Sequence, residues 1–318
     1  MSVRELVIGT RGSKLALWQA GWVKERLEAA HPGLACRLET ITTTGDKILD
    51  VALAKVGGQG LFVKEIEEAL LAGRIDLAVH SMKDVPTELP AGLAIAAMSA
   101  REDPRDAVVT RNGAPLMSLP DGAVIGTSSL RRRVQLKHMR ADFALRALRG
   151  NVDTRLRKLE EDDLDAVILA AAGMKRLGLA DRIVECLAPE RMLPAVGQGV
   201  LGIEARLDDG RVGDLVAALD DELAHRTVLG ERAFLGRLEG GCQVPIGCFG
   251  RLEGERFVLR GMVGHPRGEP ILFGERAGSL DEATSMGQAL AEDLLAQGAG
   301  RILEEVYREE GHPLPGSA

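Results

Sequence analysis

Aromatic side chains are scarce in this chain: phenylalanine, tryptophan and tyrosine together make up 3% of its 318 residues. Cysteine is also rare, with four residues and no CxxC pair. The chain is therefore no disulfide-built scaffold, and we expect it in a reducing cytoplasm. Charged residues interrupt the apolar runs near the N-terminus, and no run elsewhere is long enough to span a bilayer. We expect neither a secretory signal nor a membrane segment.

The overall charge balance is acidic, with a formal net charge of −7, which argues against nucleic acid or an anionic membrane as a partner. One segment, residues 131–158, opposes this balance, because it holds ten basic residues against Asp142 and Asp153. Single-strand binders interleave aromatics with basic residues, and this segment has only Phe143. The segment therefore favours a small polyanion as ligand. The alternative is that many of these charges are solvated helix faces.

Hydrophobic periodicity predicts alternating strands and helices in the first two thirds of the chain and an α+β pattern after about residue 220. Strands are expected at 5–10, 34–44, 75–81, 92–98, 123–130 (running into a helix), 143–150, 164–173, 247–252, 256–263 and 270–276. Helices are expected at 13–30, 61–73, 129–140, 151–163, 222–236, 280–297 and 299–309, and a loop at 45–60. The fold class is α/β, with two lobes and a smaller α+β C-terminal domain.

Two proline-bearing segments are candidate crossings between domains: REDPRD at 101–106 and MLPAVGQGVLGIEARL at 192–207. Together with the change of pattern near residue 220, they predict a chain that leaves the first lobe, builds a second and returns. The predicted domains are 1–99 with 200–219, 100–199, and 220–318.

Two predicted strand-to-helix junctions, IGTRGS (8–13) and IGTSSLRR (125–132), have the same design. Each strand ends at Gly-Thr, and each helix opens beside serine, so amide hydrogens and the helix dipole favour an anion there. Arg11, Arg131 and Arg132 add forked donors suited to carboxylates. The alternative is that these serines are ordinary helix caps. No P-loop and no GxGxxG after a strand occurs, so nucleotide binding has little support.

A third junction, AVHSMKDVP (78–86), places Ser81, Lys83 and Asp84 after a buried strand. Ligands collect at the carboxyl ends of strands in open α/β sheets, and a carboxylate beside a lysine can hold a proton or stabilise a cation. The alternative is a surface ion pair of little worth. His80 is interpreted as a core histidine.

The segment LEGGCQVPIG (238–247) places Cys242 after two glycines and before Pro245, so its backbone is expected to bend and present the thiol. A thiolate is a nucleophile suited to covalent attachment. Three alternatives stay open: a buried core thiol, a disulfide with Cys248, and a zinc site with Cys248 and His265. The last is poor, because no cluster has metal-ligand spacing, and we expect no metal.

Five motifs in this order carry a family resemblance: HSMKDVP, GTSSLRR, LRGNVDTRL, LPAVGQG and LEGGCQVPIG. The chain resembles the porphobilinogen deaminase family, also called the hydroxymethylbilane synthases, over almost its whole length. The resemblance implies two lobes like those of periplasmic binding proteins and a third domain that carries the cysteine loop. It also implies a monomer with no nucleic-acid or membrane partner.

The implied reaction condenses four porphobilinogen molecules head to tail, releases ammonia each time, and hydrolyses the product to hydroxymethylbilane for tetrapyrrole synthesis. The implied cofactor is a dipyrromethane, tied by a thioether to Cys242. Its carboxylates, and those of the growing chain, explain the need for many arginines.

The resemblance also implies roles for individual residues. Asp84 is the implied catalytic residue. The implied cofactor-binding residues are Ser81, Lys83, Asp84, Thr127, Ser128, Ser129, Arg131, Arg132, Gly150 (through its backbone) and Arg155. The implied substrate-binding residues are Arg11, Ser13, Gln19, Arg149, Arg155 and Arg176. Phe62 either packs on a pyrrole or is a core residue at a helix start. Arg133, Arg140 and Arg157 have no such support and are interpreted as solvated charges.

One position departs from the family pattern: Gln59 stands where the family usually has lysine, within KVGGQGLFVKE. Lys55 and Lys64 remain, so we expect the reaction to survive with a loop less attractive to carboxylates. The rival function is a non-enzymatic, two-lobed module that binds small anions. It would explain the lobes and arginines, but neither the third domain nor the Cys242 segment.

Overall fold

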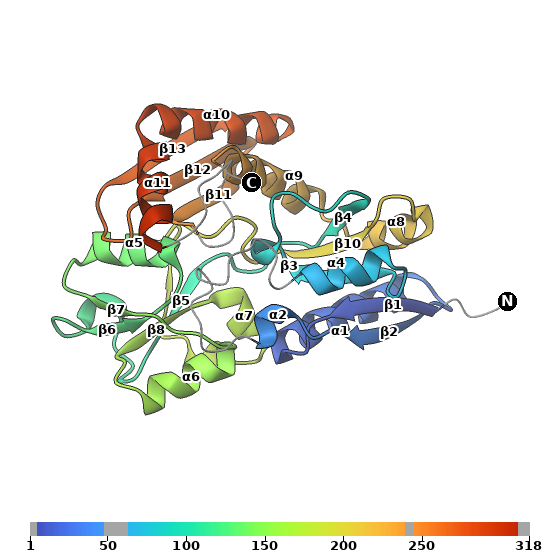
Figure 1. Cartoon of the computed structure of the whole chain (residues 1–318), viewed down its shortest axis with the longest axis horizontal. Helices are drawn as coiled ribbons and strands as arrows, with labels where there is room; N and C mark the ends of the chain where they lie inside the picture. The colour runs from blue at the N-terminus through green and yellow to red at the C-terminus, as the bar shows by residue number, and fades with distance from the viewer. Residues whose placement is uncertain (1–4, 48–62, 239–243, 311–318) are drawn as a thin grey trace. The chain divides into compact units, whose positions relative to one another are not determined.

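A computed structural model describes residues 5–47, 63–238 and 244–310 of the chain (Figure 1). Its contacts divide the chain into two compact units. Among the described residues, the first comprises 5–47, 63–102 and 199–225, and the second comprises 103–198, 226–238 and 244–310. Each unit therefore draws on segments far apart in the sequence. Within the described ranges, no helix is both long and apolar enough to cross a membrane.

The first unit is built on five strands: β1 (Glu5–Thr10), β2 (Ala35–Thr40), β3 (Leu77–Ser81), β4 (Leu93–Met98) and β10 (Leu201–Arg206). They form one sheet in the order β2-β1-β3-β10-β4 (Figure 1). β1 pairs in parallel with β2 and β3, whereas β10 runs antiparallel to both β3 and β4. The parallel strands β1 and β3 therefore end at the same edge of the sheet.

Helices cover both faces of this sheet. Alternate β3 residues meet different helices, because side chains of a strand alternate between faces. Leu77 and Val79 share a core with α1 and α8, and Ala78 shares one with α4. The helices of this unit are α1 (Lys14–Ala30), the short α2 (Thr44–Lys47), α4 (Lys64–Leu71) and α8 (Gly210–Val216).

The second unit contains a sheet of the same design, made of β5 (Asp106–Thr110), β6 (Val124–Gly126), β7 (Ala144–Arg146), β8 (Ala166–Ala170) and β9 (Glu185–Leu187). The order is β7-β6-β8-β5-β9, with β6 parallel to β7 and β8, and β5 antiparallel to β8 and β9. The helices are α5 (Leu130–Met139), α6 (Val152–Glu161) and α7 (Ala171–Arg176).

One strand pairs out of chain order. β10 follows the second lobe in sequence but pairs between β3 and β4 of the first sheet, whereas β5 is the first of the five consecutive strands that form the second sheet. The segments 101–106 and 192–207, predicted as crossings, therefore also supply strand residues, which the sequence reading missed. Their glycines and prolines concealed a strand signal that is realised only by pairing with distant partners.

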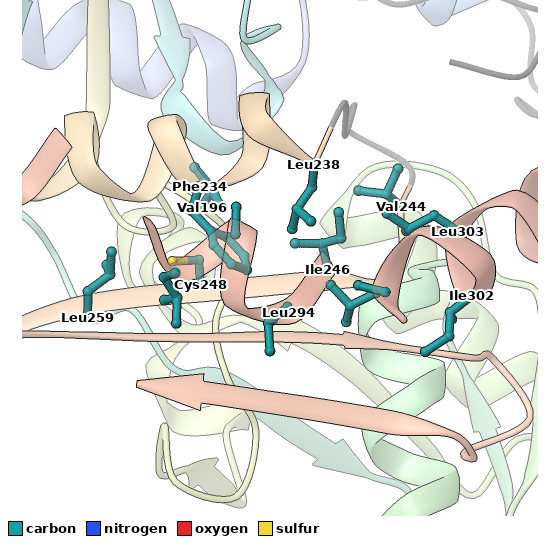
Figure 2. Close-up of a cluster of buried hydrophobic side chains, with 14 of the residues drawn as sticks. Val196, Phe234, Leu238, Val244, Ile246, Cys248, Leu259, Leu294, Ile302 and Leu303 are labelled. Carbon is teal, nitrogen blue, oxygen red and sulfur yellow. The ribbon is translucent and has the colours of Figure 1, made fainter. Parts of the chain in front are cut away.

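The second unit also holds a three-stranded antiparallel sheet of β11 (Ile246–Glu253), β12 (Arg256–Gly264) and β13 (Ile271–Gly278). α9 (Glu222–Arg237) precedes it, and α10 (Ala283–Ala296) and α11 (Ala299–Glu310) pack against it (Figure 1). Figure 2 shows the shared core, where Phe234, Ile246 and Leu294 meet beside the fully buried Cys248. The predicted fold class, two α/β lobes plus a smaller α+β domain, is confirmed.

Several predicted elements are shorter than expected. The strand predicted at 34–44 ends at Thr40, and α2 begins at Thr44. The strand predicted at 164–173 ends at Ala170, because Ala171–Arg176 forms α7 from good helix formers. Short 3-10 helices, absent from the prediction, lie at Met82–Asp84, Leu116–Ser118, Ala180–Arg182 and Ala217–Leu219, and the helix predicted at 280–297 opens with a 3-10 turn at Leu280–Glu282.

Candidate functional site

The first unit gathers predicted site residues at the edge where β1 and β3 end. Arg11 follows β1 directly and is partly exposed. Ser13 caps α1, and its side chain accepts a hydrogen bond from the Ala16 amide at 3.2 Å. Ser13 therefore acts as a helix cap, the alternative that the sequence left open for this serine. The same cap leaves the first amides of α1 at this edge, which favours a carboxylate.

Gln19 of α1 supports Ser81 at the end of β3. It is 3% exposed, and its Nε2 donates to Ser81 Oγ at 2.9 Å. This bond joins α1 to the end of β3. The sequence assigned Gln19 to substrate, whereas the structure gives it a partner inside the protein. Its contact with substrate stays a prediction.

Lys83 and Asp84 lie on the 3-10 helix Met82–Asp84, directly after β3. The Met82 amide donates at 3.0 Å to the carbonyl of Val200, the residue before β10, so the segment entering β10 holds the start of this turn. Met82 is buried, Lys83 is partly exposed and Asp84 is exposed. The turn is therefore anchored through Met82, and it presents the Lys83 ammonium group and the Asp84 carboxylate outward.

Gly202 on β10 allows this turn to pack closely. A Cβ at Gly202 would lie 2.2 Å from Met82 Sδ, which is much closer than real atoms approach. We expect Gly202→Ala to lower the free energy of unfolding by about 1–3 kcal/mol, because Met82 must move within a packed core. Urea unfolding measures the change. Gly210→Ala is the control, since a Cβ there meets nothing within 4 Å; equal effects of the two would contradict the packing argument.

The second unit presents a similar edge at the end of β6. Thr127 Oγ1 accepts from the Ser129 amide at 3.2 Å, and Ser129 caps α5 by accepting from the Arg132 amide at 3.4 Å. Ser128 Oγ donates to the Leu148 carbonyl at 2.9 Å and accepts from its amide at 3.0 Å. These hydroxyls shape the loop. Ser128 is also exposed and Ser129 partly exposed, which leaves them accessible to a ligand.

The loop after β7 carries two further arginines. Gly150 has φ of +107°, a left-handed conformation that favours glycine. Arg155 Nε donates to the Gly150 carbonyl at 2.8 Å, which fixes the loop to the first turn of α6. Arg149 and Arg155 are partly exposed, and partial burial lowers the pKa of Arg149. Arg176 ends α7, which follows β8, and is also partly exposed.

Arg131 and Arg132 are placed differently from the other arginines. Both are about 95% buried, and both bind Asp106, which is fully buried at the start of β5. Arg131 Nη1 lies 2.7 Å from one Asp106 oxygen, and Arg132 Nη2 lies 2.7 Å from the other. The sequence analysis assigned both guanidinium groups to the cofactor; the structure gives them a buried ion triad. Direct contact with a ligand stays a prediction for both.

Asp106 was missed by the sequence reading. It also accepts from Gln198 Nε2 at 3.1 Å, so the LPAVGQG segment joins the triad. Burial alone would raise the pKa of Asp106, but the charges and hydrogen bonds of Arg131 and Arg132 outweigh it and hold the pKa well below its usual range. The available signal was weak: an acidic residue opens an apolar, strand-like run, DAVVT.

Arg140 was interpreted as a solvated charge, and this interpretation is wrong. Its side chain is 16% exposed and donates to the Leu119 carbonyl at 2.8 Å, and its guanidinium carbon lies 4.4 Å from the Phe143 ring centroid. It packs a turn. Arg157 fits the interpretation, since it is largely exposed and lies 3.6 Å from Glu161.

A histidine and two glutamates stand close together beside α11. Ligand atoms of His265, Glu305 and Glu309 lie within 4.8 Å of one another. Arg267 already binds both carboxylates, at 3.0 Å and 2.8 Å. His265 Nδ1 accepts from the Arg267 amide at 3.2 Å, so a neutral ring carries its proton on Nε2, the atom that would bind a metal. The group is an ion-pair network.

Some predictions fall outside the described residues. Cys242 with its two glycines, Phe62, Gln59 and Lys55 lie in the ranges 48–62 and 239–243. The flanking Leu238 and Val244 are buried in the core of Figure 2. Cys248, fully buried there, has the core-thiol environment that was an alternative for Cys242.

Two family models match successive parts of the chain. The family model for the porphobilinogen deaminase dipyromethane cofactor binding domain matches residues 6–214, and the model for the porphobilinogen deaminase C-terminal domain matches residues 225–296. The chain is 54% identical over 310 residues to porphobilinogen deaminase of Geobacter metallireducens, covering 98% of this chain and 97% of the relative. It is 53% identical, with the same coverage, to that of Geotalea uraniireducens.

Among solved structures, the chain is similar to a periplasmic binding protein of Salmonella typhimurium described as highly specific for arginine. The identity is 16% and the TM-score 0.37, and the match covers 70% of this chain and 94% of that one.

Proposed function

Because this chain belongs to the porphobilinogen deaminase family, it is a transferase of tetrapyrrole biosynthesis, and we propose that the residues described above bind and polymerise porphobilinogen. The product would be hydroxymethylbilane, released by hydrolysis after four condensations. The observation that carries this function is 54% identity over 98% of the chain. The non-enzymatic anion-binding module is disfavoured, because residues 225–296 match the family's C-terminal domain.

The cofactor is a dipyrromethane, in keeping with the family model that matches the first two thirds of the chain. Such a group carries several carboxylates and pyrrole N–H groups, and the donor set fits it. Arg11, Lys83, Arg149, Arg155 and Arg176 are each partly exposed cations at strand or helix ends. When bound, the group supplies a primer to which substrate units are added. The residues proposed to hold it are Ser81, Lys83, Asp84, Thr127, Ser128, Ser129, Arg131, Arg132, Gly150 and Arg155.

The remaining cations are proposed to meet the carboxylates of substrate and growing chain. Arg11, Arg149 and Arg176 have the forked, permanently charged donors that suit carboxylates. Ser13, Gln19 and Phe62 complete the proposed substrate set. Arg11 and Ser13 are neighbours at the start of α1, where the helix dipole adds to the attraction of an anion.

Asp84 is the proposed catalytic residue. Its exposed carboxylate can accept hydrogen bonds from pyrrole N–H groups, stabilise positive charge as ammonia leaves, and hold a proton. Lys83, its neighbour on the same turn, would neutralise a ligand carboxylate. Met82, buried beneath both, keeps the turn in place.

The organisation and setting of the enzyme are also part of the proposal. The three domains are 1–99 with 200–219, 100–199, and 220–318, a division supported by the unit bounds at Glu102 and Gly199. We propose a cytoplasmic monomer with no nucleic-acid or membrane partner, in keeping with the net charge of −7.

Attachment of the cofactor to Cys242 through a thioether is the decisive test. We expect the purified chain to exceed its sequence mass by two pyrrole units and to react with Ehrlich's reagent. Cys242→Ser, prepared mildly, should lack the added mass, the colour and measurable turnover, because a hydroxyl is a much poorer nucleophile than a thiolate.

Cys186→Ser is the matched control, because Cys186 is a partly buried free thiol far from Cys242 in sequence. It should keep the added mass and the colour. Full added mass on Cys242→Ser would refute the attachment site, and an unmodified, inactive wild type would favour the anion-binding module.

A further inference from the structure

Three ionisable side chains are buried together on the α4 face of the first sheet. Glu67 of α4, His80 of β3 and Glu204 of β10 are 8%, 6% and 0% exposed. Their surroundings are apolar, since Ile66, Leu70 and other core residues fill this face. Acidic residues are rarely buried to this degree unless they are paired. Nothing in the proposed mechanism uses these three side chains.

Their geometry leaves one position open. His80 Nε2 lies 2.9 Å from Glu204 Oε2, a buried pair. The other oxygen, Glu204 Oε1, is buried and makes no hydrogen bond within the described residues. A buried carboxylate oxygen without a donor is unfavourable. A proton donor on a neighbouring element would remove this cost.

Glu67 is suited to be that donor. α4 packs against both β3 and β10, and the charge of Glu204 acts on Glu67. Burial, followed by repulsion from Glu204, raises the pKa of Glu67 to about 7, with His80 opposing the rise. A protonated Glu67 donates where an ionised one would repel.

We infer that Glu67, Glu204 and His80 form a positioning network, in which a proton carried by Glu67 and donated to the open Glu204 oxygen holds the end of β3 that carries Ser81, Lys83 and Asp84. This inference rests on the proposed function of that end. β10 connects the network to this end of β3, because Gly202 pairs with His80 and Leu201 pairs with Ser81 in the sheet. The network acts on one face of β3 while Gln19 holds Ser81 on the other.

Other charged groups on the elements around Glu67 are few. On α4, the exposed Glu68 adds to the rise in pKa of Glu67. Arg206 of β10 donates to the Leu70 and Ile75 carbonyls and pairs with Asp209 at 2.9 Å. The remaining charged residues are Lys64 and Glu65 of α4 and the exposed Glu5 of β1. β4 contains no charged residue.

Loss of that proton leaves a buried charge on Glu67 that the charge of Glu204 repels, so the end of β3 should loosen as pH rises through about 7. The sign is fixed by the direction of the shift. A carboxyl whose pKa is raised in the folded state keeps its proton at lower pH and releases it above the raised value. Turnover should therefore fall on the alkaline side because of this network.

The first measurement is a carbon NMR titration of the Glu67 carboxyl in the unaltered holoenzyme with labelled glutamate. The expected midpoint is about 7, and an ordinary midpoint near 4.5 would overturn the network. This measurement needs no turnover. A failed assay for hydroxymethylbilane would refute the proposed function while the titration still reported on the network.

The second measurement is the pH profile of kcat for Glu67→Gln, which keeps a donor but cannot ionise. The ratio of kcat at pH 8.5 to kcat at pH 6.5 should rise by at least about threefold over wild type. Glu68→Gln removes the same charge from the solvent side of the same helix and should leave the ratio within about 1.5-fold. Superimposable profiles of the two variants would overturn the inference, as a purely structural Glu67 would give them.

Discussion

Replacing Asp84 with asparagine should reduce kcat by at least about a thousandfold, since proton transfer and charge stabilisation would be lost together. Asparagine keeps the size of the side chain but carries no charge, so positive charge that develops as ammonia leaves has no counterion. Asp84→Glu should retain slight activity, because it keeps the charge and displaces it by one methylene. The rate of hydroxymethylbilane formation measures both.

Two checks separate chemistry from assembly in this series. Intact mass should show the cofactor still attached to Asp84→Asn, so that the loss falls on turnover. Glu88→Gln removes an exposed carboxylate four residues further along the same segment and should be close to wild type. Near-normal turnover of Asp84→Asn would refute the catalytic role of Asp84.

Asp106→Asn should destabilise the second unit by about 3–5 kcal/mol, the range found when one partner of a buried ion pair is removed. Arg131 and Arg132 would remain buried with no counterion, and Gln198 would lose its carboxylate acceptor. Urea or thermal unfolding of the holoenzyme measures the loss. The low pKa of Asp106 means that this stabilisation is complete above the unfolded value of 3.8 and declines only as pH falls below it.

Asp121→Asn is the matched control, because Asp121 also pairs with an arginine but is fully exposed. A surface pair contributes little, so the change should stay below about 1 kcal/mol. If Arg131 and Arg132 act only as ligand donors, Asp106→Asn should be as mild as this control. That result would contradict the structural role assigned to the triad.

The sequence predicted local features well. Ser13 and Ser129 cap α1 and α5 as expected, because a cap is decided by residues within one helical turn. The strand ends that present Arg11 and Asp84 were also predicted, since a buried apolar run followed by polar residues is a signal contained in one short segment.

Features that depend on distant partners were missed. β10 became a strand by pairing with β3 and β4, more than a hundred residues away, and its segment was interpreted as a hinge. Arg131 and Asp106 are 25 residues apart, and no local pattern separates an arginine in a buried ion pair from one that awaits a ligand. Gln19 is a similar case, since its partner Ser81 lies on another element.

The return of β10 to the first sheet has a consequence for synthesis on the ribosome. All five strands of the second lobe lie between residues 106 and 187, so that lobe can close its sheet as soon as this stretch has emerged. The first lobe, although made earlier, cannot: β4 has β10 as its neighbour in the sheet, and β10 ends at Arg206. The lobe translated first is therefore completed second. A nascent chain halted near residue 190 would hold a complete second lobe and an incomplete first lobe. The unpaired strand edges of the first lobe would need protection from aggregation.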